Sequence, residues 1–253
     1  MTPGEGPSVT CPQTCPLSAT TAGAGGPRPP TIPGVTSDAH ETPSAAEIER
    51  LADLYGPFTQ AVRELVDATI RTLVDDDEVR RAQAEVEAIT ARLRAHQLDG
   101  SYGASLTGPG PQRTWGNTAV GLRNAAAPPL VVQRHPEGRA TCDLHLGAAY
   151  EGPPTLVHGG VSALVLDQML GEAVMASGTP AMTGRLTLSY RRGTPLGDLR
   201  AEAWVERTEG HKAFARGHIL GPDGEPTVEA EGVFIVPRHL REHPSDAAVG
   251  DAG

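Results

Sequence analysis

The sequence predicts an α+β fold in which a single buried helix packs against an antiparallel sheet. Residues 160–176 are long enough for a helix and are apolar almost all round, which is typical of a buried helix. Four segments after this helix alternate residue by residue between two faces, which is the period of a β-strand. Short turns rich in glycine and proline separate these segments, and such turns favour antiparallel pairing.

The N-terminal part of the chain predicts a tail followed by helices. We expect residues 1–43 to be disordered, because Pro, Gly, Thr and Ser dominate there and large apolar residues are nearly absent. Residues 44–99 predict an amphipathic helical extension. Ser44 and Glu47 form the pattern of a capping box, a common helix start. Pro57 either interrupts this first helix or begins a new one at its first turn.

A second helix is expected after the acidic run at residues 75–78, because acidic side chains stabilise the first turn of a helix. Asp99-Gly100 would end it. Both helices should pack against the main domain or against a second subunit, rather than carry a separate activity. Residues 100–119, rich in glycine and proline, predict a linker. The apolar residues of the second helix recur at threes and fours, the spacing of a helix–helix seam: Val79, Ala82, Val86, Ile89 and Leu93.

Residues 120–238 contain the expected main domain, and residues 239–253 a flexible C-terminal tail. Two strands, Leu130–His135 and Arg139–Leu146, should flank a turn at Pro136-Glu137-Gly138. The buried helix follows, and then an antiparallel meander of four strands. Small residues recur on several of these strands, so we expect the helix to approach the sheet closely. The alternating residues include Leu186, Leu188, Tyr190, Ala201, Ala203, Val205, Ala213, Ala215, Gly217, Ile219, Val228, Ala230, Gly232, Phe234 and Val236.

Composition excludes several classes of function. The net charge of −10 argues against a nucleic acid partner. No apolar run approaches the roughly 20 residues that a membrane span requires. The N-terminus has neither a basic start nor an apolar core, so no secretory signal is expected and the cytoplasm is the predicted location. Cys11, Cys15 and Cys142 make an odd count without the spacing of a zinc site, so neither a disulfide framework nor a metal site is predicted.

His158-Gly159-Gly160 opens the buried helix and is the most informative motif in the chain. A helix that starts at two glycines offers free backbone N–H groups and a positive dipole end, with no side chain to block an incoming group. From residue 161 to 175 only Asp167 and Glu172 are charged. Because burying an unpaired carboxylate costs several kcal/mol, Asp167 needs a capping, pairing or chemical reason.

These residues together resemble those of the PaaI-type acyl-CoA thioesterases, and within that group the THEM4-like branch (thioesterase superfamily member 4). The resemblance covers roughly residues 120–238. It implies the hotdog fold, in which a curved antiparallel sheet wraps a buried helix. It also implies a homodimer or a dimer of dimers, with sheets joined edge to edge and active sites between subunits. The matching segments are Glu151–Pro154, Leu156–Gly160, Asp167, Met182-Thr183, Leu188–Arg192 and Glu209–Lys212.

The resemblance implies hydrolysis of acyl-CoA thioesters to free coenzyme A and a carboxylic acid. Asp167 would act as a general base on water or attack directly. The N–H groups of Gly159 and Gly160 would polarise the thioester carbonyl, and the Thr183 hydroxyl would orient the water. His158 either holds the loop by a hydrogen bond or takes part in the chemistry. The plainer alternatives are a structural Asp167 paired with an arginine across the interface, a tight turn at the glycines, and an ordinary strand threonine.

Five further residues are candidates for binding the coenzyme A part of the substrate. Arginine and lysine at strand ends suit phosphate groups, and an acidic protein that keeps them together favours a local anion site. The alternative is a solvated strand end. Coenzyme A would be part of the substrate, so no separate cofactor is expected. The candidates are Tyr190, Arg191, Arg192, His211 and Lys212.

One position departs from the resemblance. Several PaaI-type enzymes carry an asparagine six residues before the histidine, where this chain has Gly152; THEM4-like members lack it as well. The oxyanion site would then depend on backbone groups, with His158 as a further candidate. Two other functions stay open: a non-catalytic acyl-CoA sensor or scaffold, and a hotdog dehydratase or hydratase. The latter needs an Asp/His or Glu/His pair that the buried helix does not display.

Overall fold

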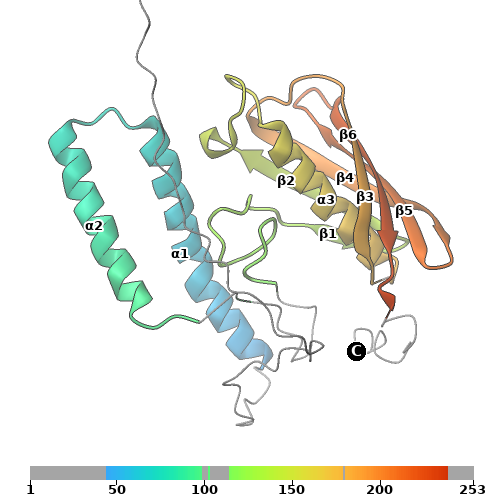
Figure 1. Ribbon diagram of the computed structural model, residues 1–253, viewed down its shortest axis with the longest axis horizontal. Coiled ribbons are helices and arrows are strands. Elements are labelled where there is room, and N and C mark those ends of the chain that lie inside the picture. Colours follow the sequence, from blue (N-terminus) through green and yellow to red (C-terminus); the bar gives the residue numbers. More distant parts are fainter. Residues whose placement is uncertain (1–43, 99–101, 103–113, 179, 239–253) are drawn as a thin grey trace, which may run out of the picture. The chain divides into compact units, whose positions relative to one another are not determined.

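The computed structural model describes residues 44–98, 102, 114–178 and 180–238 (Figure 1). The two expected tails and most of the expected linker lie outside these residues. In chain order the elements are α1 (Ala45–Arg71), α2 (Asp76–Arg94), β1 (Gln133–His135), β2 (Arg139–Leu146), the short 3₁₀ helix η1 (Ala148–Tyr150), α3 (Gly159–Ala176), β3 (Met182–Tyr190), β4 (Gly197–Glu209), β5 (Lys212–Leu220) and β6 (Pro226–Ile235).

The main part of the fold is one antiparallel sheet of six strands in the order β1-β2-β4-β5-β6-β3. Figure 1 shows α3 lying against one face of this sheet, which confirms the predicted α+β fold. Two glycines let the helix come close. A Cβ atom on Gly217 would lie 2.9 Å from Leu170 Cδ1, and one on Gly232 would lie 2.7 Å from Leu170 Cδ2. The predicted close approach over small strand residues is therefore confirmed.

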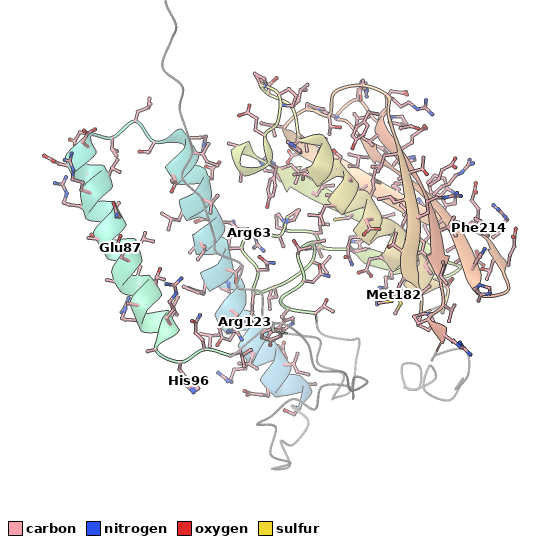
Figure 2. The ribbon with its side chains drawn as sticks, in the orientation of Figure 1. Arg63, Glu87, His96, Arg123, Met182 and Phe214 are labelled. Carbon is pink, nitrogen blue, oxygen red and sulfur yellow. The ribbon has the colours of Figure 1, made fainter. Side chains whose placement is uncertain are left out.

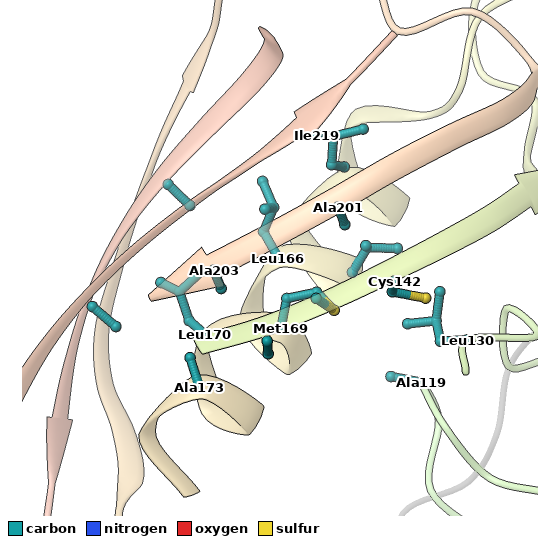
Figure 3. Close-up of a cluster of buried hydrophobic side chains, with 14 of the residues drawn as sticks. Ala119, Leu130, Cys142, Leu166, Met169, Leu170, Ala173, Ala201, Ala203 and Ile219 are labelled. Atoms are coloured by element: carbon teal, nitrogen blue, oxygen red, sulfur yellow. The ribbon is translucent and has the colours of Figure 1, made fainter. Parts of the chain in front are cut away.

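The core lies between α3 and the sheet. Figure 3 shows Leu166, Met169 and Leu170 of α3 directed towards Ala201 and Ala203 of β4. All five residues are completely buried. None of the helices in the described part of the chain is long and apolar enough to cross a membrane. The apolar surface of α3 is instead covered largely by the sheet, as predicted for a buried helix.

The strand order corrects one prediction. β4, β5 and β6 form the expected meander, but β3 pairs with β6 at the far edge of the sheet, and β2 occupies the place next to β4. The segment between β3 and β4 cannot close a hairpin because it is held at the start of α3. Val157 N–H donates to the Thr194 carbonyl over 2.9 Å, and Leu156 forms a β-bridge with Pro195. β3 is therefore an edge strand.

Helix α1 confirms one expectation and corrects another. The Ser44 hydroxyl accepts a hydrogen bond from Glu47 N–H over 3.2 Å, as the predicted cap requires. The helix then continues through Pro57 without a break, so neither alternative for this proline applies. Two arginines anchor α1 to the segment before β1 (Figure 2): Arg63 donates to the Asn124 carbonyl over 3.1 Å, and the Arg123 guanidinium lies 3.7 Å from the centre of the Tyr55 ring.

Helix α2 begins where predicted. The Asp75 side chain accepts a hydrogen bond from Glu78 N–H over 2.9 Å and caps the helix. The helix ends at Arg94, before the expected Asp99-Gly100 stop. None of its residues is buried, and its predicted apolar seam is 38–52% exposed at Val79, Val86, Ile89 and Leu93. The seam is therefore not covered by the described part of this chain.

Candidate functional site

Asp167 and Thr183 form a hydrogen-bonded pair between α3 and the edge strand β3. The Thr183 hydroxyl donates to Asp167 Oδ1 over 2.8 Å, and Thr183 is exposed. Among the described residues Asp167 Oδ2 has no hydrogen-bond partner. Asp167 is half-buried, and no described arginine pairs with it. A half-buried carboxylate with one oxygen fixed and the other without a described partner can accept a proton from a water molecule.

The start of α3 is capped by the side chain of His158. Its Nδ1 atom accepts a hydrogen bond from Gly160 N–H over 3.0 Å. Because Nδ1 is the acceptor, the neutral ring carries its proton on Nε2, and this outer nitrogen is a donor. The His158 side chain thus holds the first turn of α3 by a hydrogen bond. Gly160 N–H is occupied in this state, whereas Gly159 N–H has no acceptor among the described residues.

One glycine is required for the close packing around this helix start, and a hydrogen bond from Tyr190 holds its other side. A Cβ atom on Gly152 would lie 2.7 Å from His158 Cα, so no other residue fits there without a shift. The loop around it is held by His158 N–H, which donates to the Tyr150 carbonyl over 2.9 Å. On the other side, the Tyr190 hydroxyl donates to the Gly159 carbonyl over 2.9 Å, which ties the end of β3 to the start of α3.

The chain does not bring all the predicted site residues together. Asp167 lies eight residues beyond Gly159 on α3, which at 1.5 Å per residue separates them by about 12 Å along the helix axis. The substrate-binding candidates are divided in the same way. Tyr190 pairs with Val228 near one end of β6, whereas Lys212 pairs with Ile235 at its other end. In one chain the predicted site residues therefore fall into two groups at opposite ends of β3.

Both arginines after β3 already have carboxylate partners. Arg191 Nε donates to a Glu229 carboxylate oxygen over 2.6 Å. Arg192 donates to both carboxylate oxygens of Asp223, in the turn between β5 and β6, and to the Glu225 carbonyl. The Arg192 guanidinium lowers the pKa of Asp223 to about 2. Neither arginine stands free for a phosphate group in this state, although both are largely exposed.

Sequence reasoning did not assign a role to Glu172, the second carboxylate of α3. Its side chain is 10% exposed and accepts hydrogen bonds from Arg134 Nε over 2.5 Å and from Gln168 Nε2 over 2.7 Å. Glu172 is thus the structural carboxylate of the helix, paired with β1. The i, i+4 spacing of Gln168 and Glu172 is a signal in the sequence, but Arg134 lies 38 residues away and nothing local points to it.

Sequence reasoning also missed a cavity beside the first turns of α3. Its volume is about 390 Å³, and its walls come from α1, the segment before β1, η1 and α3. No motif marks these residues, because they are ordinary apolar residues that only the fold brings together. The lining includes Val66, Ala126, Pro128, Tyr150, Val161 and Leu164.

The chain is similar in sequence and in structure to known thioesterases. The family pattern described as "Thioesterase superfamily" matches residues 155–227, from just before His158 into β6. A solved structure of a thioesterase superfamily protein is similar to this chain with 33% identity and a TM-score of 0.64, covering 72% of this chain and 90% of the other. Residues 120–238 alone could not supply that coverage, so the similarity extends into the N-terminal part.

Two curated relatives are similar over a shorter stretch. Acyl-coenzyme A thioesterase THEM4 from Xenopus laevis is 34% identical over 101 residues, which is 39% of this chain and 46% of the relative. The protein of the same name from Bos taurus is 30% identical over 109 residues, which is 42% of this chain and 44% of the relative. The match thus spans less than half the length of either relative.

Proposed function

The chain belongs to the thioesterase superfamily, and on that premise we propose that it hydrolyses acyl-CoA thioesters to free coenzyme A and a carboxylic acid. The single observation that carries the proposal is the hydrogen bond from Thr183 to Asp167. It provides an oriented carboxylate on a helix that is otherwise almost free of charge. The name shared by the two curated relatives supports acyl-CoA as the substrate class.

In the proposed reaction Asp167 is the general base. It takes a proton from a water molecule, whose oxygen forms a bond to the thioester carbonyl carbon. The tetrahedral intermediate then collapses, the carbon–sulfur bond breaks, and the proton passes to the leaving thiolate. Thr183 holds Oδ1 and so directs Oδ2 to the water. Direct attack by Asp167 would instead form an anhydride that water must open.

The negative charge that develops on the carbonyl oxygen needs hydrogen-bond donors. Gly159 N–H is unoccupied in the described part of the chain and lies at the positive end of α3. The Nε2–H of His158 is a second donor close by, and it supports a role for this residue as a donor rather than a base. These two groups replace the amide that Gly152 lacks.

The active site is proposed to form between two copies of the chain. A thioester carbonyl cannot reach both Asp167 and Gly159 of one α3, because about 12 Å separates them along the helix. Two copies related by a two-fold axis would pair their β3 edges antiparallel. This pairing brings the Thr183 end of one strand towards the Tyr190 end of the other. It also brings His211 and Lys212 towards the partner's Arg191 and Arg192, as coenzyme A binding requires.

The test uses two defective variants, alone and combined. Asp167→Asn should lower kcat by about 10²–10⁴-fold because it removes the base. Gly159→Pro removes the N–H without disturbing the preceding backbone, since His158 already has φ −60° and ψ 130°, which a following proline accepts. It should lower kcat by about 10²–10³-fold relative to Gly159→Ala, the control that adds the same Cβ but keeps the N–H. Free coenzyme A is measured with a thiol reagent.

Heterodimers that combine the two variants, purified through two different tags, should regain about half of the wild-type activity, since one of their two sites has both intact groups. Heterodimers as inactive as their parents would exclude a site shared between chains. Undiminished hydrolysis by Asp167→Asn would remove Asp167 from the mechanism. A wild-type protein that binds acyl-CoA but releases no thiol would favour the alternative, a non-catalytic acyl-CoA-binding protein.

A further inference from the structure

The cavity beside α3 has a mainly apolar lining and one wall that does not belong to the sheet-and-helix core. Val66 of α1 closes it from one side, and Tyr150 of η1 from another. Val161 and Leu164 of α3 form the inner wall. A cavity of about 390 Å³ is at the small end of the range for ligand pockets, so it suits a compact apolar group.

The cavity lies on the face of α3 that carries the proposed chemistry. Residues 160, 164 and 167 are spaced by four and three, so Gly160, Leu164 and Asp167 share one helix face. Leu164 therefore lines the cavity between the glycine start of the helix and the carboxylate. Tyr150 connects the cavity to the same place, because its carbonyl accepts the His158 N–H. A group held in this cavity would be close to the Gly159 end of α3, where the thioester carbonyl is proposed to bind.

Helix α1 is fixed against the rest of the cavity rather than loosely placed. The Ala127 carbonyl accepts hydrogen bonds from Arg63 Nε and from the Tyr150 hydroxyl, both over 3.2 Å, and so joins α1 to η1. Thr59, one turn before Arg63, is 3% exposed. Burial also raises the pKa of Tyr150, which keeps its hydroxyl protonated and donating. The position of Val66 is therefore set by contacts on both sides of the cavity.

Beyond Val66 the surroundings become more polar and include charged side chains. A second cavity of about 400 Å³ shares Val66 and Tyr150 with the first, but Arg63, Asp67 and His145 contribute to its lining. An apolar chain long enough to pass Val66 would leave the apolar cavity and meet charged groups, whose desolvation is unfavourable. The change of lining at Val66 thus limits the length of an apolar ligand.

We propose that this cavity holds the acyl group of the substrate, and that α1 through Val66 selects compact apolar acyl groups of medium length or with one aromatic ring. The inference rests on the hydrolysis proposed above and adds to it the substrate class. It assigns to the N-terminal helix, which lies outside residues 155–227 of the family match, the role of a specificity wall.

The test measures kcat/KM of the full-length protein for acetyl-, octanoyl-, phenylacetyl- and palmitoyl-CoA. The wild type should prefer octanoyl- or phenylacetyl-CoA to palmitoyl-CoA by at least tenfold. Val66→Trp fills the cavity and should lower the ratio of octanoyl to acetyl activity by at least tenfold. Val66→Ala should raise the ratio of palmitoyl to octanoyl activity several-fold. Leu65→Trp is the matched control: Leu65 is 43% exposed and Val66 42%, but Leu65 lines neither cavity, so this variant should leave the profile unchanged.

The outcomes separate the two proposals. An active wild type whose chain-length profile is the same in both Val66 variants would overturn the role of the cavity and leave hydrolysis standing. An equal loss of activity on all four substrates in Val66→Trp would do the same, because a wall of an acyl pocket must discriminate between them. A wild type that releases no coenzyme A from any of the four would overturn the proposed hydrolysis, and the assigned ligand with it.

Discussion

Helices α3 and α2 are almost equal in length, 18 and 19 residues, yet they place their residues in opposite surroundings. Eight residues of α3 are buried against the sheet, whereas α2 has none. Both helices have side-chain caps, His158 and Asp75. The difference therefore does not come from helix formation. It comes from composition, because an apolar helix gains free energy by burial and a charged helix does not.

The comparison shows how charge should be interpreted in this chain. On α2 the ion pairs, such as Arg80 with Asp77, are exposed on both sides and contribute little. On α3 each of the two carboxylates has a distinct surrounding. Glu172 is enclosed by Arg134 and Gln168, whereas the only described partner of the Asp167 side chain is the Thr183 hydroxyl. A charge on the buried helix therefore requires its own explanation, and the one without a cation is the candidate for chemistry.

The largest expected change in the free energy of unfolding comes from removing a buried side chain of α3. Leu170→Ala on α3 should lower the free energy of unfolding by about 2–5 kcal/mol, because Leu170 is completely buried against Gly217 and Gly232. Leu93→Ala on α2, where the side chain is 52% exposed, should change it by no more than about 0.5 kcal/mol. Urea unfolding measures both. If both variants lowered the free energy of unfolding equally, the seam of α2 would be covered by another copy in solution.

A smaller effect is expected for the ion pairs. Arg134→Ala should lower the free energy of unfolding by about 1–3 kcal/mol, because it leaves the nearly buried Glu172 with only Gln168 as a described partner. The double variant Arg134→Met/Glu172→Gln should restore most of this stability, since no charge is then buried. The matched change on α2, Arg80→Ala, should cost less than about 0.5 kcal/mol. A double variant no more stable than Arg134→Ala would show that the unpaired charge of Glu172 is not the cause of the loss.

The smallest expected effect concerns thiol reactivity. Cys142 of β2 is buried beneath α3, and burial raises the pKa of its thiol. Because the unfolded chain would lose this proton first, stability should fall as the pH rises above about 8.5, the ordinary value. With Cys11 and Cys15 replaced by serine, Cys142 should react with a thiol reagent at least about a hundredfold more slowly than a cysteine introduced at Ala82 of α2. Comparable rates would show that α3 opens readily.

The local features of the fold were predictable from the sequence because they depend on neighbouring residues. The caps at Ser44 and Asp75 and the C-terminal end of α3 at Ala176 follow from side chains within a few positions. The effect of Pro57 was harder to predict, since both alternatives assumed that a proline disturbs a helix. Helix α1 instead continues through Pro57 and contacts residues 123–127.

Long-range pairing was not predictable in the same way. Alternation identifies a strand but not its neighbour, so the place of β3 beside β6 could not be derived from it. The candidate site shows the same division. The motif identified Asp167 and Thr183 as separate candidates, but their hydrogen bond depends on how β3 crosses α3. The cavity at Val66 is formed by residues from four separate segments of the chain. Periodicity within one segment cannot predict that these segments come together.

The two edges of the sheet differ greatly in length, and this has a consequence for assembly. β3 offers nine residues, with an irregularity in register between Thr183 and Arg185, while β1 at the opposite edge has only three. A strand that pairs with its own copy leaves nothing further to extend from that side, and three residues are too few to template another chain. In the proposed dimer, growth would therefore stop after a single addition, and the edge that joins the two copies would also protect them from forming fibres.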